Sequence, residues 1–322
     1  MIRLGILGCA SIADRMFLPA IKLAEGIECV GVASRNKTKC EVFAQKHGIS
    51  AYGSYDELIN DDGIDAIYIP LPPSLHHEYA KKAMLCGKHV MVEKPATVSL
   101  RQAEDLVATA RQLNVALHEN YMFAFHSQLS YIINKISSGE LGQLRLIRSS
   151  FGFPLREAND FRYNKELGGG ALLDAGGYPI KLCGMLLGQS ARLVCAQGSM
   201  LPGYDVDMYG SASFVNDEGL VCQIAYGFDN SYMCSLEIWG SKARLTTNRI
   251  FTAPPQLRPT INIESSNGRE VIELEADNHF RASIDVFSQS IIDADKRQQL
   301  LDGILKQSSM MENVKQHATA NN

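Results

Sequence analysis

Short apolar runs alternate with longer amphipathic stretches along the first 120 residues of the chain. The apolar runs are rich in β-branched residues, as buried strands are, and helical periodicity follows each one. The predicted strands are IRLGILG (2–8), IECVGVA (27–33), DAIYIP (65–70), HVMVE (89–93) and VALHE (115–119). The predicted helices cover 12–24, 37–47, 74–86 and 99–113. Because right-handed crossovers join such strands in parallel, the pattern predicts a doubly wound, Rossmann-type sheet.

The pattern changes near residue 120, where successive strands replace the alternation of strands and helices. A helix (127–138), a strand (144–153) and a helix after the Gly168–Gly170 run come first, and further strands fill 192–274. Two helices, over 279–293 and 299–318, close the chain. Adjacent strands favour an antiparallel sheet with one face packed on helices. We therefore predict an α/β protein: a dinucleotide-binding domain over 1–120, and over 121–322 an α+β substrate-binding and oligomerisation domain with an open-faced, mainly antiparallel sheet.

Composition excludes several classes of partner. Lys and Arg number 31 against 35 Asp and Glu, which gives a net charge of −4 and no basic field for nucleic acid. No apolar run is long enough to span a membrane. The eight cysteines are scattered and lack the spacing of a zinc site, so we expect buried, reduced thiols and no metal. These features predict a cytoplasmic protein that binds neither nucleic acid nor membrane.

The first predicted strand ends in a degenerate dinucleotide-binding fingerprint. Its residues are Gly8, Cys9, Ala10, Ser11, Ile12 and Ala13, with alanine at the second and third glycine positions. The first glycine permits a tight turn, and small residues let backbone N–H groups approach a pyrophosphate at the start of a helix. We predict cofactor binding here; the alternative is an ordinary tight turn.

The second predicted strand is followed by cations where many NAD-binding proteins have an acid. Ser34, Arg35 and Lys39 follow this strand, and no carboxylate accompanies them. Hydroxyls and cations suit the 2′-phosphate of NADP, and an arginine can also stack on adenine. The sequence thus favours NADP(H) over NAD(H); the alternative is a solvated turn with ordinary surface charge.

Two segments far apart in the sequence carry candidate catalytic groups. Lys94 lies in GKHVMVEKPA (87–96) at the end of the fourth strand, where doubly wound sheets bind ligands, and Pro95 holds it extended. Asp174 and Tyr178 lie in GGGALLDAGGYPI (168–180), four residues apart and therefore on one face of a helix over 170–178. Tyrosine offers a proton, aspartate a fixed acceptor, and a nearby ammonium would lower the tyrosine pKa. The alternatives are a surface lysine and a core tyrosine.

These motifs together resemble the Gfo/Idh/MocA oxidoreductases, named for glucose–fructose oxidoreductase and inositol dehydrogenase. The resemblance runs from the glycine-rich turn through PPSLHH, GKHVMVEKP and DAGGYP, and covers residues 1 to about 190. It implies a nicotinamide-dependent enzyme that acts on sugars, inositols or related alcohols. It also implies that the free face of the second sheet forms a homodimer or homotetramer.

The resemblance assigns roles to residues of the first domain. It makes Lys94 the lysine that hydrogen-bonds the reacting oxygen, and Glu93 the residue that places the nicotinamide ribose. It places His76 near the cofactor and leaves His77 peripheral. Two further cofactor contacts are expected at the end of the third strand, Pro70 and Leu71.

The Asp-x-x-x-Tyr pattern of Asp174 and Tyr178 resembles one branch of the family. Many sugar and inositol dehydrogenases have histidine at the second of these positions, so Tyr178 argues against inositol dehydrogenation. In ENYMFAFHSQ (119–128), Ala124 stands where xylose and dihydrodiol dehydrogenases commonly have arginine. The segment 148–180 is similar to NADPH-dependent 3-ketoreductases of nucleotide-linked sugars, which make deoxysugars. The expected substrate contacts are Tyr121, Phe123, Arg156, Arg162 and Tyr163, with core packing or exposed loop charge as the alternatives.

The expected reaction is therefore hydride transfer from NADPH to the 3-keto group of a nucleotide-linked sugar. Lys94 would stabilise the oxyanion and Asp174 would hold the orientation, with either Lys94 or Tyr178 giving the proton. One alternative is NADP-dependent oxidation of a free aldose or diol, of the xylose, glucose or dihydrodiol type, by the same residues. The other is a non-catalytic NADP-binding sensor.

Overall fold

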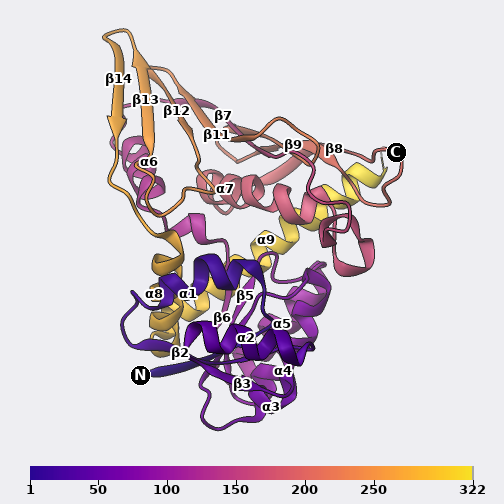
Figure 1. The fold of residues 1–322 in the computed structure, drawn as a ribbon. Helices are drawn as coiled ribbons and strands as arrows, with labels where there is room; N and C mark the ends of the chain where they lie inside the picture. Colours follow the sequence, from indigo (N-terminus) through magenta and orange to yellow (C-terminus); the bar gives the residue numbers. More distant parts are fainter. Residues whose placement is uncertain (321–322) are drawn as a thin grey trace. The chain divides into compact units, whose positions relative to one another are not determined.

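A computed structural model describes residues 1–320 and divides them into two compact units (Figure 1). The first unit comprises Met1–Tyr121 and Phe280–Ser308, and the second comprises Met122–His279 and 309–320. The sequence pattern predicts an uninterrupted second domain from 121 onward. The structure differs because residues 280–308 pack into the first unit instead.

The first unit contains a six-stranded parallel sheet, which confirms the predicted doubly wound architecture. Its strand order is β3-β2-β1-β4-β5-β6, and every neighbouring pair is parallel. The strands are β1 (Ile2–Leu7), β2 (Ile27–Ala33), β3 (Ser50–Tyr52), β4 (Ala66–Ile69), β5 (His89–Glu93) and β6 (Leu117–Asn120). The order reverses at β1 and β4, so the carboxyl ends of these strands form the crevice where such sheets bind ligands.

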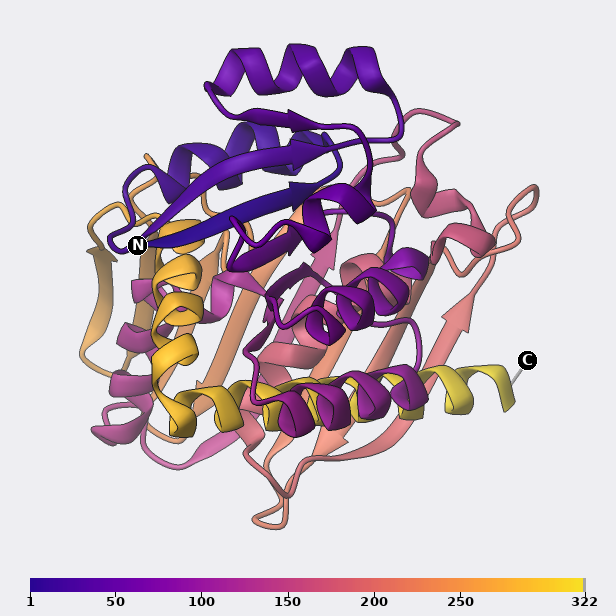
Figure 2. The ribbon, with the colours of Figure 1, turned by 90° about the horizontal axis from the view of Figure 1, so that it is seen from below.

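Helices of the first unit connect the strands and complete its core. The helical elements are η1 (Ala13–Phe17), α1 (Leu18–Ile21), α2 (Lys37–His47), α3 (Tyr55–Asn60), α4 (Pro73–Leu85), α5 (Leu100–Leu113), α8 (His279–Ile292) and the first part of α9 (Ala294–Ala320). The helix predicted over 12–24 is a π-helical turn followed by a short α-helix. Figure 2 shows α5 beside α9. Leu301 and Ile304 of α9 lie in the same apolar core as Leu106 of α5.

The second unit contains an eight-stranded, mainly antiparallel sheet, as predicted. Its order is β14-β13-β12-β11-β7-β10-β9-β8, and only the central pair β7 and β10 is parallel. The strands are β7 (Leu144–Gly152), β8 (Arg192–Ser199), β9 (Tyr209–Val215), β10 (Val221–Gly227), β11 (Met233–Gly240), β12 (Ala243–Asn248), β13 (Thr260–Ser265) and β14 (Gly268–Glu273).

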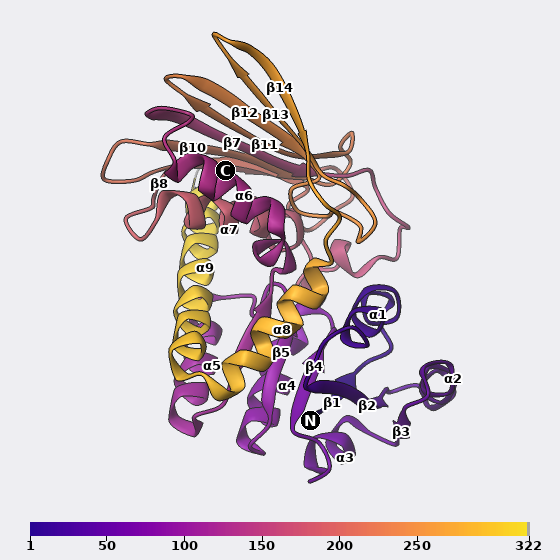
Figure 3. The same cartoon turned by 90° about the vertical axis from the view of Figure 1, so that its left-hand side faces the viewer.

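One face of this second sheet is covered by helices, as Figure 3 shows. The helical elements of this unit are η2 (Met122–Phe125), α6 (Ser127–Ser137), η3 (Phe161–Tyr163), η4 (Lys165–Leu167), η5 (Leu172–Gly176) and α7 (Gly177–Leu187). Along β11, Leu236 and Ile238 are buried, whereas Trp239, on the opposite face, is 54% exposed. This alternation is that of a sheet with one free face. No helix within residues 1–320 is long and apolar enough to cross a bilayer.

Candidate active site

The turn after β1 has the geometry that the fingerprint predicts. Gly8 has a φ of +103°, and its N–H donates a hydrogen bond to the Ala33 carbonyl over 2.8 Å. A Cβ at Gly8 would lie 2.9 Å from Leu71 Cδ2, so both the conformation and the space require glycine. Ala13 is buried against the sheet, whereas Ser11 is exposed at the turn. The predicted cofactor contact Leu71 thus lies directly beside the glycine turn.

A cavity of about 660 Å³ lies between this turn and α2. Its lining residues are Cys9, Ala10, Ser11, Asp14, Asn36, Thr38, Lys39, Val42, Phe43 and Lys46. The carboxylate of Asp14 lies 2.6 Å from Lys46 Nζ and 2.7 Å from His47 Nε2, and these contacts hold the pKa of Asp14 below its usual range. Of the residues predicted to hold a 2′-phosphate, Lys39 lines the cavity, and Ser34 and Arg35 follow β2 beside it. A glycine-lined turn, small side chains and adjacent cations fit a phosphorylated dinucleotide.

His76 connects the turns that follow β4 and β5. Its side chain is fully buried; Nε2 lies 2.7 Å from the Leu71 carbonyl and Nδ1 lies 2.8 Å from the Pro95 carbonyl. Burial lowers the pKa of His76 to about 4, with a further contribution from the charge of Lys94. The neutral ring can donate only one hydrogen bond, so it serves one of the two carbonyls at a time. His76 therefore ties Leu71 to the turn that carries Lys94, while Pro70 is buried at the end of β4.

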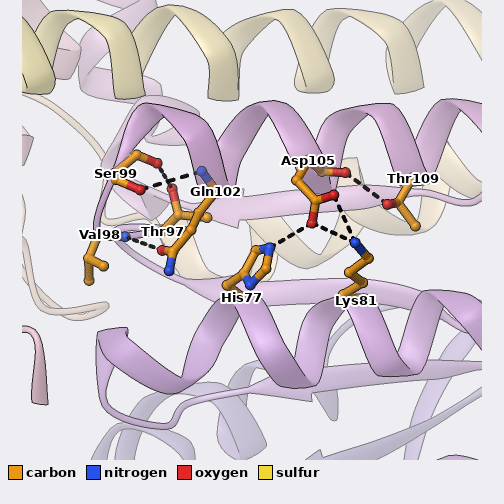
Figure 4. Close-up of polar contacts among 8 residues, drawn as sticks. All are labelled: His77, Lys81, Thr97, Val98, Ser99, Gln102, Asp105 and Thr109. Carbon is orange, nitrogen blue, oxygen red and sulfur yellow. Dashed lines mark hydrogen bonds and ion pairs between the residues drawn. The ribbon is translucent and has the colours of Figure 1, made fainter.

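His77 lies outside this arrangement, as the resemblance implies. Its Nε2 lies 2.7 Å from Asp105 Oδ2, and Lys81 Nζ lies 2.8 Å from both oxygens of the same carboxylate; Figure 4 shows these three side chains pointing toward one another. These contacts join α4 to α5. Ser99 caps α5 by accepting a hydrogen bond from the Gln102 N–H. The cap fixes the end of the segment after Lys94 to the start of α5.

Glu93 belongs to a buried polar network beside Lys94. Its Oε1 accepts hydrogen bonds of 2.6 Å from the Tyr68 hydroxyl and of 2.6 Å from Asn120 Nδ2. Burial raises the pKa of Glu93, and these two hydrogen bonds oppose the rise. The Ser283 hydroxyl of α8 donates to Asn120 Oδ1 over 2.8 Å and lies 2.8 Å from His118 Nε2, which therefore donates to it. This network fixes the carboxylate that precedes Lys94.

The sequence analysis did not identify the partners of Glu93. Asn120 ends the last strand of the parallel sheet. Because ligands bind at the carboxyl ends of such strands, a polar residue there could have been recognised from the sequence as a candidate site residue. Ser283 gave no such signal, because it contacts Asn120 across 163 residues of sequence.

The second group of candidate residues lies at the start of α7, where a π-helical turn replaces part of the predicted helix. Asp174 lies in η5 and Tyr178 in α7. Gly170 has a φ of +113°, and a Cβ there would lie 2.3 Å from Asp207 Oδ1. Asp207 Oδ2 accepts a hydrogen bond from the Leu172 N–H over 2.6 Å, and burial raises the pKa of Asp207 to about 6. Turns of this kind occur often at functional sites.

Arg162 is paired with carboxylates in the structure. Its Nε lies 2.6 Å from Asp174 Oδ2, and its Nη1 lies 3.1 Å from Asp160 Oδ1. The sequence suggested that Arg162 contacts the substrate through a diphosphate or sugar hydroxyls, and that contact stays a prediction. The structure shows a guanidinium with two of its nitrogens engaged by carboxylates of the same unit.

Tyr178 is surrounded by aromatic rings and is 6% exposed. The ring centroids of Phe151, Phe251 and Phe123 lie 5.0, 5.6 and 5.8 Å from its own. Its hydroxyl lies 3.9 Å from Met122 Sδ, a weak contact. Phe123 is fully buried in this cluster, which favours core packing over its predicted role as a pocket residue.

The remaining predicted substrate contacts differ in exposure. Tyr121 is 1% exposed, and its hydroxyl accepts a hydrogen bond from Gln307 Nε2 over 3.3 Å. Arg156 is exposed, with its guanidinium 5.1 Å from the ring centroid of Phe153, and its backbone N–H donates to the Tyr163 hydroxyl over 2.7 Å. Arg156 and Tyr163 are thus accessible to a ligand, whereas Tyr121 is not. Within residues 1–320, no three His, Cys, Asp or Glu side chains are grouped as metal ligands would be.

Family models match both parts of the chain. Residues 2–121 match the oxidoreductase family with an NAD-binding Rossmann fold, described as GFO_IDH_MocA. Residues 131–246 match the GFO/IDH/MocA C-terminal domain.

Individual relatives extend along nearly the whole chain. A dTDP-3,4-didehydro-2,6-dideoxy-alpha-D-glucose 3-reductase from Actinomadura kijaniata is 35% identical over 98% of this chain and 95% of its own length. A D-xylose 1-dehydrogenase (NADP(+)) 2 from Haloferax volcanii is 30% identical over 89% of this chain and 88% of its own. A 3-ketoreductase from Actinomadura kijaniata, solved with NADP and TDP-benzene, superposes with a TM-score of 0.95 at 35% identity, covering 98% of this chain and 97% of that one.

Proposed function

The chain belongs to the Gfo/Idh/MocA oxidoreductase family, and we propose on that basis that it transfers hydride from NADPH to the 3-keto group of a TDP-linked deoxysugar. The observation that carries the proposal is the 35% identity, over 98% of the chain, to a 3-reductase of such a sugar. The family-typical Lys94, Asp174 and Tyr178 are all present in this sequence, as such a reaction requires.

We assign the cofactor to the first unit. Gly8, Cys9, Ala10 and Ser11 would hold the pyrophosphate at the turn after β1, and Ser34, Arg35 and Lys39 would hold the 2′-phosphate. Glu93, fixed by Tyr68 and Asn120, would orient the nicotinamide ribose. When bound, NADPH supplies the hydride. The cations after β2 favour NADP(H) over NAD(H).

Three side chains are proposed to act on the keto group. As hydride adds to the carbonyl carbon, the oxygen gains negative charge, and the Lys94 ammonium stabilises it by donating a hydrogen bond. The Tyr178 hydroxyl gives its proton to that oxygen, which completes the product alcohol, and regains a proton from solvent. Asp174 holds the orientation of the site. The rings around Tyr178 exclude water, which strengthens these interactions.

Substrate contacts beyond the keto group are proposed for the accessible residues Arg156 and Tyr163. A guanidinium matches the geometry of a diphosphate, and an aromatic ring suits a sugar or a base.

We further propose that the free face of the second sheet forms a homodimer or homotetramer. Trp239 on β11 is 54% exposed there, and tryptophan is enriched at protein interfaces. No disulfide joins the eight cysteines, all of which lie within residues 1–320; this suits a reducing compartment, and we place the reaction in the cytoplasm.

The decisive experiment offers the protein a TDP-linked 3-keto-dideoxysugar with NADPH and follows the loss of reduced nicotinamide. Turnover with NADPH well above that with NADH is the expected result. A parallel panel of free aldoses and diols with NADP tests the dehydrogenase activity that the similarity to D-xylose 1-dehydrogenase raises. Turnover of a free sugar at micromolar-to-millimolar KM would replace the proposal with that activity. Tight NADPH binding without turnover of either class would identify a sensor.

A further inference from the structure

Arg162 contacts the segment that carries the proposed proton donor. We propose that Arg162 is a positioning residue, which fixes and keeps ionised the carboxylate of Asp174 and thereby sets the reactivity of Tyr178. This inference rests on the proposed function, whose site it deepens. All of its elements lie within the second unit.

The pair of Arg162 and Asp174 is short and shielded from water. Arg162 Nε lies 2.6 Å from Asp174 Oδ2, and the two side chains are 19% and 11% exposed. Charge-assisted hydrogen bonds at such distances are about twice as strong as neutral ones. Removing the cation of a shielded ion pair takes away an interaction that favours the charged form of the carboxylate, which raises the pKa of the carboxyl group. Without Arg162, Asp174 would take up a proton at a higher pH.

A second carboxylate fixes the orientation of the guanidinium. Asp160 Oδ1 accepts hydrogen bonds of 3.1 Å from both the backbone N–H and Nη1 of Arg162. Although burial opposes it, Asp174 and Asp160 together raise the pKa of Arg162, so its charge is permanent. A planar fork held at two nitrogens has one orientation toward Asp174, which the point charge of a lysine cannot reproduce.

The backbone of Arg162 is bonded to the same turn. Its carbonyl accepts a hydrogen bond of 2.9 Å from the Gly170 N–H, and a Cβ at Gly169 would lie only 2.4 Å from that carbonyl oxygen. The Gly170 carbonyl in turn accepts a hydrogen bond of 3.2 Å from the Asp174 N–H. Arg162 therefore bonds Gly170, just before the π-helical turn, through its backbone, and Asp174 within the turn through its side chain. Because Tyr178 follows Asp174 by four residues, the direction of the carboxylate relative to Tyr178 depends on Arg162.

The competing role is direct binding of the substrate diphosphate, which was the expectation from sequence. The two roles differ in the kinetic parameter that each controls. Loss of a diphosphate ligand raises the KM for the nucleotide-sugar at unchanged kcat, because it removes uniform binding. Loss of a positioning group lowers kcat and moves the pH profile.

The test compares Arg162→Ala and Arg162→Lys with Arg258→Ala. Arg258 is the matched control: its guanidinium also contacts two carboxylates, of Glu273 and Glu275, but it is half-exposed on the surface. We expect Arg162→Ala to lower kcat by about 10- to 100-fold with a KM within a few-fold, and to move the acid limb of the kcat profile to higher pH. Free guanidinium at non-denaturing concentration should restore part of the kcat of Arg162→Ala and leave Arg258→Ala unaffected.

The conservative variant keeps the proposal falsifiable if Arg162→Ala folds poorly. Arg162→Lys should keep the charge, and with it the wild-type acid limb, but recover only part of kcat. A raised KM with wild-type kcat and pH profile in these variants would overturn the inference in favour of diphosphate binding.

A readout independent of turnover separates this inference from the proposed function. Titration of the Asp174 carboxyl can be followed by ¹³C NMR, with Asp174→Asn identifying the signal. If the wild-type chain reduces no keto-sugar, the proposed function fails. A higher titration midpoint of Asp174 in Arg162→Ala, with a midpoint near wild type in Arg162→Lys, then still supports the pairing role, and an unchanged midpoint in Arg162→Ala overturns it.

Discussion

Asn120 Nδ2 donates a hydrogen bond of 2.6 Å to Glu93 Oε1, and the two residues are register partners at the ends of β6 and β5. Tyr68 donates to the same oxygen, and Ser283 holds the amide of Asn120 from the opposite side. Tyr68 and Asn120 both donate to the same oxygen of Glu93, so the orientation of this carboxylate is fixed without a ligand. The carboxyl edge of the sheet is thereby preorganised around a group that burial alone would tend to neutralise.

Asn120→Asp replaces this donor with a carboxyl group of the same shape. Two carboxyls in short contact cannot both be ionised, so the folded variant should retain a proton that the unfolded chain releases. Its stability should therefore fall as the pH rises, by about 1–3 kcal/mol relative to wild type between mildly acidic and mildly alkaline solution. Urea denaturation of both proteins at the two pH values measures the difference. Parallel stability profiles would contradict the role of the amide as a donor to Glu93.

Tyr178→Phe removes the proposed proton donor and little else. We expect kcat to fall by about 100-fold or more. The melting temperature should change little, because the ring and its packing against Phe151 and Phe251 are retained. Tyr131→Phe, in a half-buried tyrosine of α6, serves as the control and should keep wild-type turnover. Near-normal kcat in Tyr178→Phe would transfer the role of proton donor to Lys94.

Arg35→Ala tests the cofactor assignment. The loss of a charge-assisted contact to the 2′-phosphate should weaken NADPH binding by about 1.5–3 kcal/mol, or roughly 10- to 150-fold. NADH affinity in the same variant is the internal control and should stay close to wild type. Fluorescence titration gives both dissociation constants. Equal weakening for the two cofactors would assign Arg35 to adenine stacking rather than to the phosphate.

Asp207→Asn tests the buried carboxyl that accepts a hydrogen bond from the Leu172 N–H at the start of η5. Burial raises the pKa of Asp207 from 3.8 to about 6, so the folded chain holds a proton that the unfolded chain loses between these values. The stabilisation is complete below about pH 3.8 and is lost as the pH rises through about 6. The asparagine variant can still accept from the Leu172 N–H but has no such titration. Unfolding free energies of the two proteins should diverge by about 1–3 kcal/mol across this window.

Comparing wild type with Asp207→Asn also controls for the other groups that titrate in this pH window. His76 and His279 also have lowered pKa values, because both are buried, but they titrate equally in the two proteins and cancel in the difference. A constant difference in stability across the window would show that Asp207 is ionised in the folded state.

The sequence predicted the sites that lie at the ends of regular elements. Gly8 and Lys94 follow from the alternation of strands and helices, because parallel strands place their carboxyl ends at one edge of the sheet, whereas Glu93 was expected only from the family resemblance. The strand β3 was not predicted, since two of its three residues, Ser50 and Ala51, are exposed and the strand forms no apolar run. The π-helical turn around Asp174 was also missed, because a π-turn and an α-helix share the same apolar periodicity over so few residues.

Contacts between irregular segments could not be predicted in this way. The pairing of Arg162 with Asp174 joins a short 3₁₀ turn to a π-turn, and no periodicity relates the two. The bond from Leu172 to Asp207 likewise depends on a loop whose path the sequence pattern does not define. The sequence pointed to Arg162 for a contact with substrate, whereas its ion pair with Asp174 appears only in the structure.

The return of residues 280–308 to the first unit has a consequence for synthesis on the ribosome. The chain leaves this unit at Tyr121 and comes back at Phe280, and Leu301 and Ile304 then complete a core that includes Leu106. At a synthesis rate of about 5–20 residues per second, roughly 10–30 s pass between the synthesis of the last strand of the parallel sheet and that of these helices. During that interval the surface that α9 later covers is open to water, to other nascent chains and to chaperones. The order of translation thus makes the dinucleotide-binding unit, although it begins first, one of the last parts of the molecule to become complete.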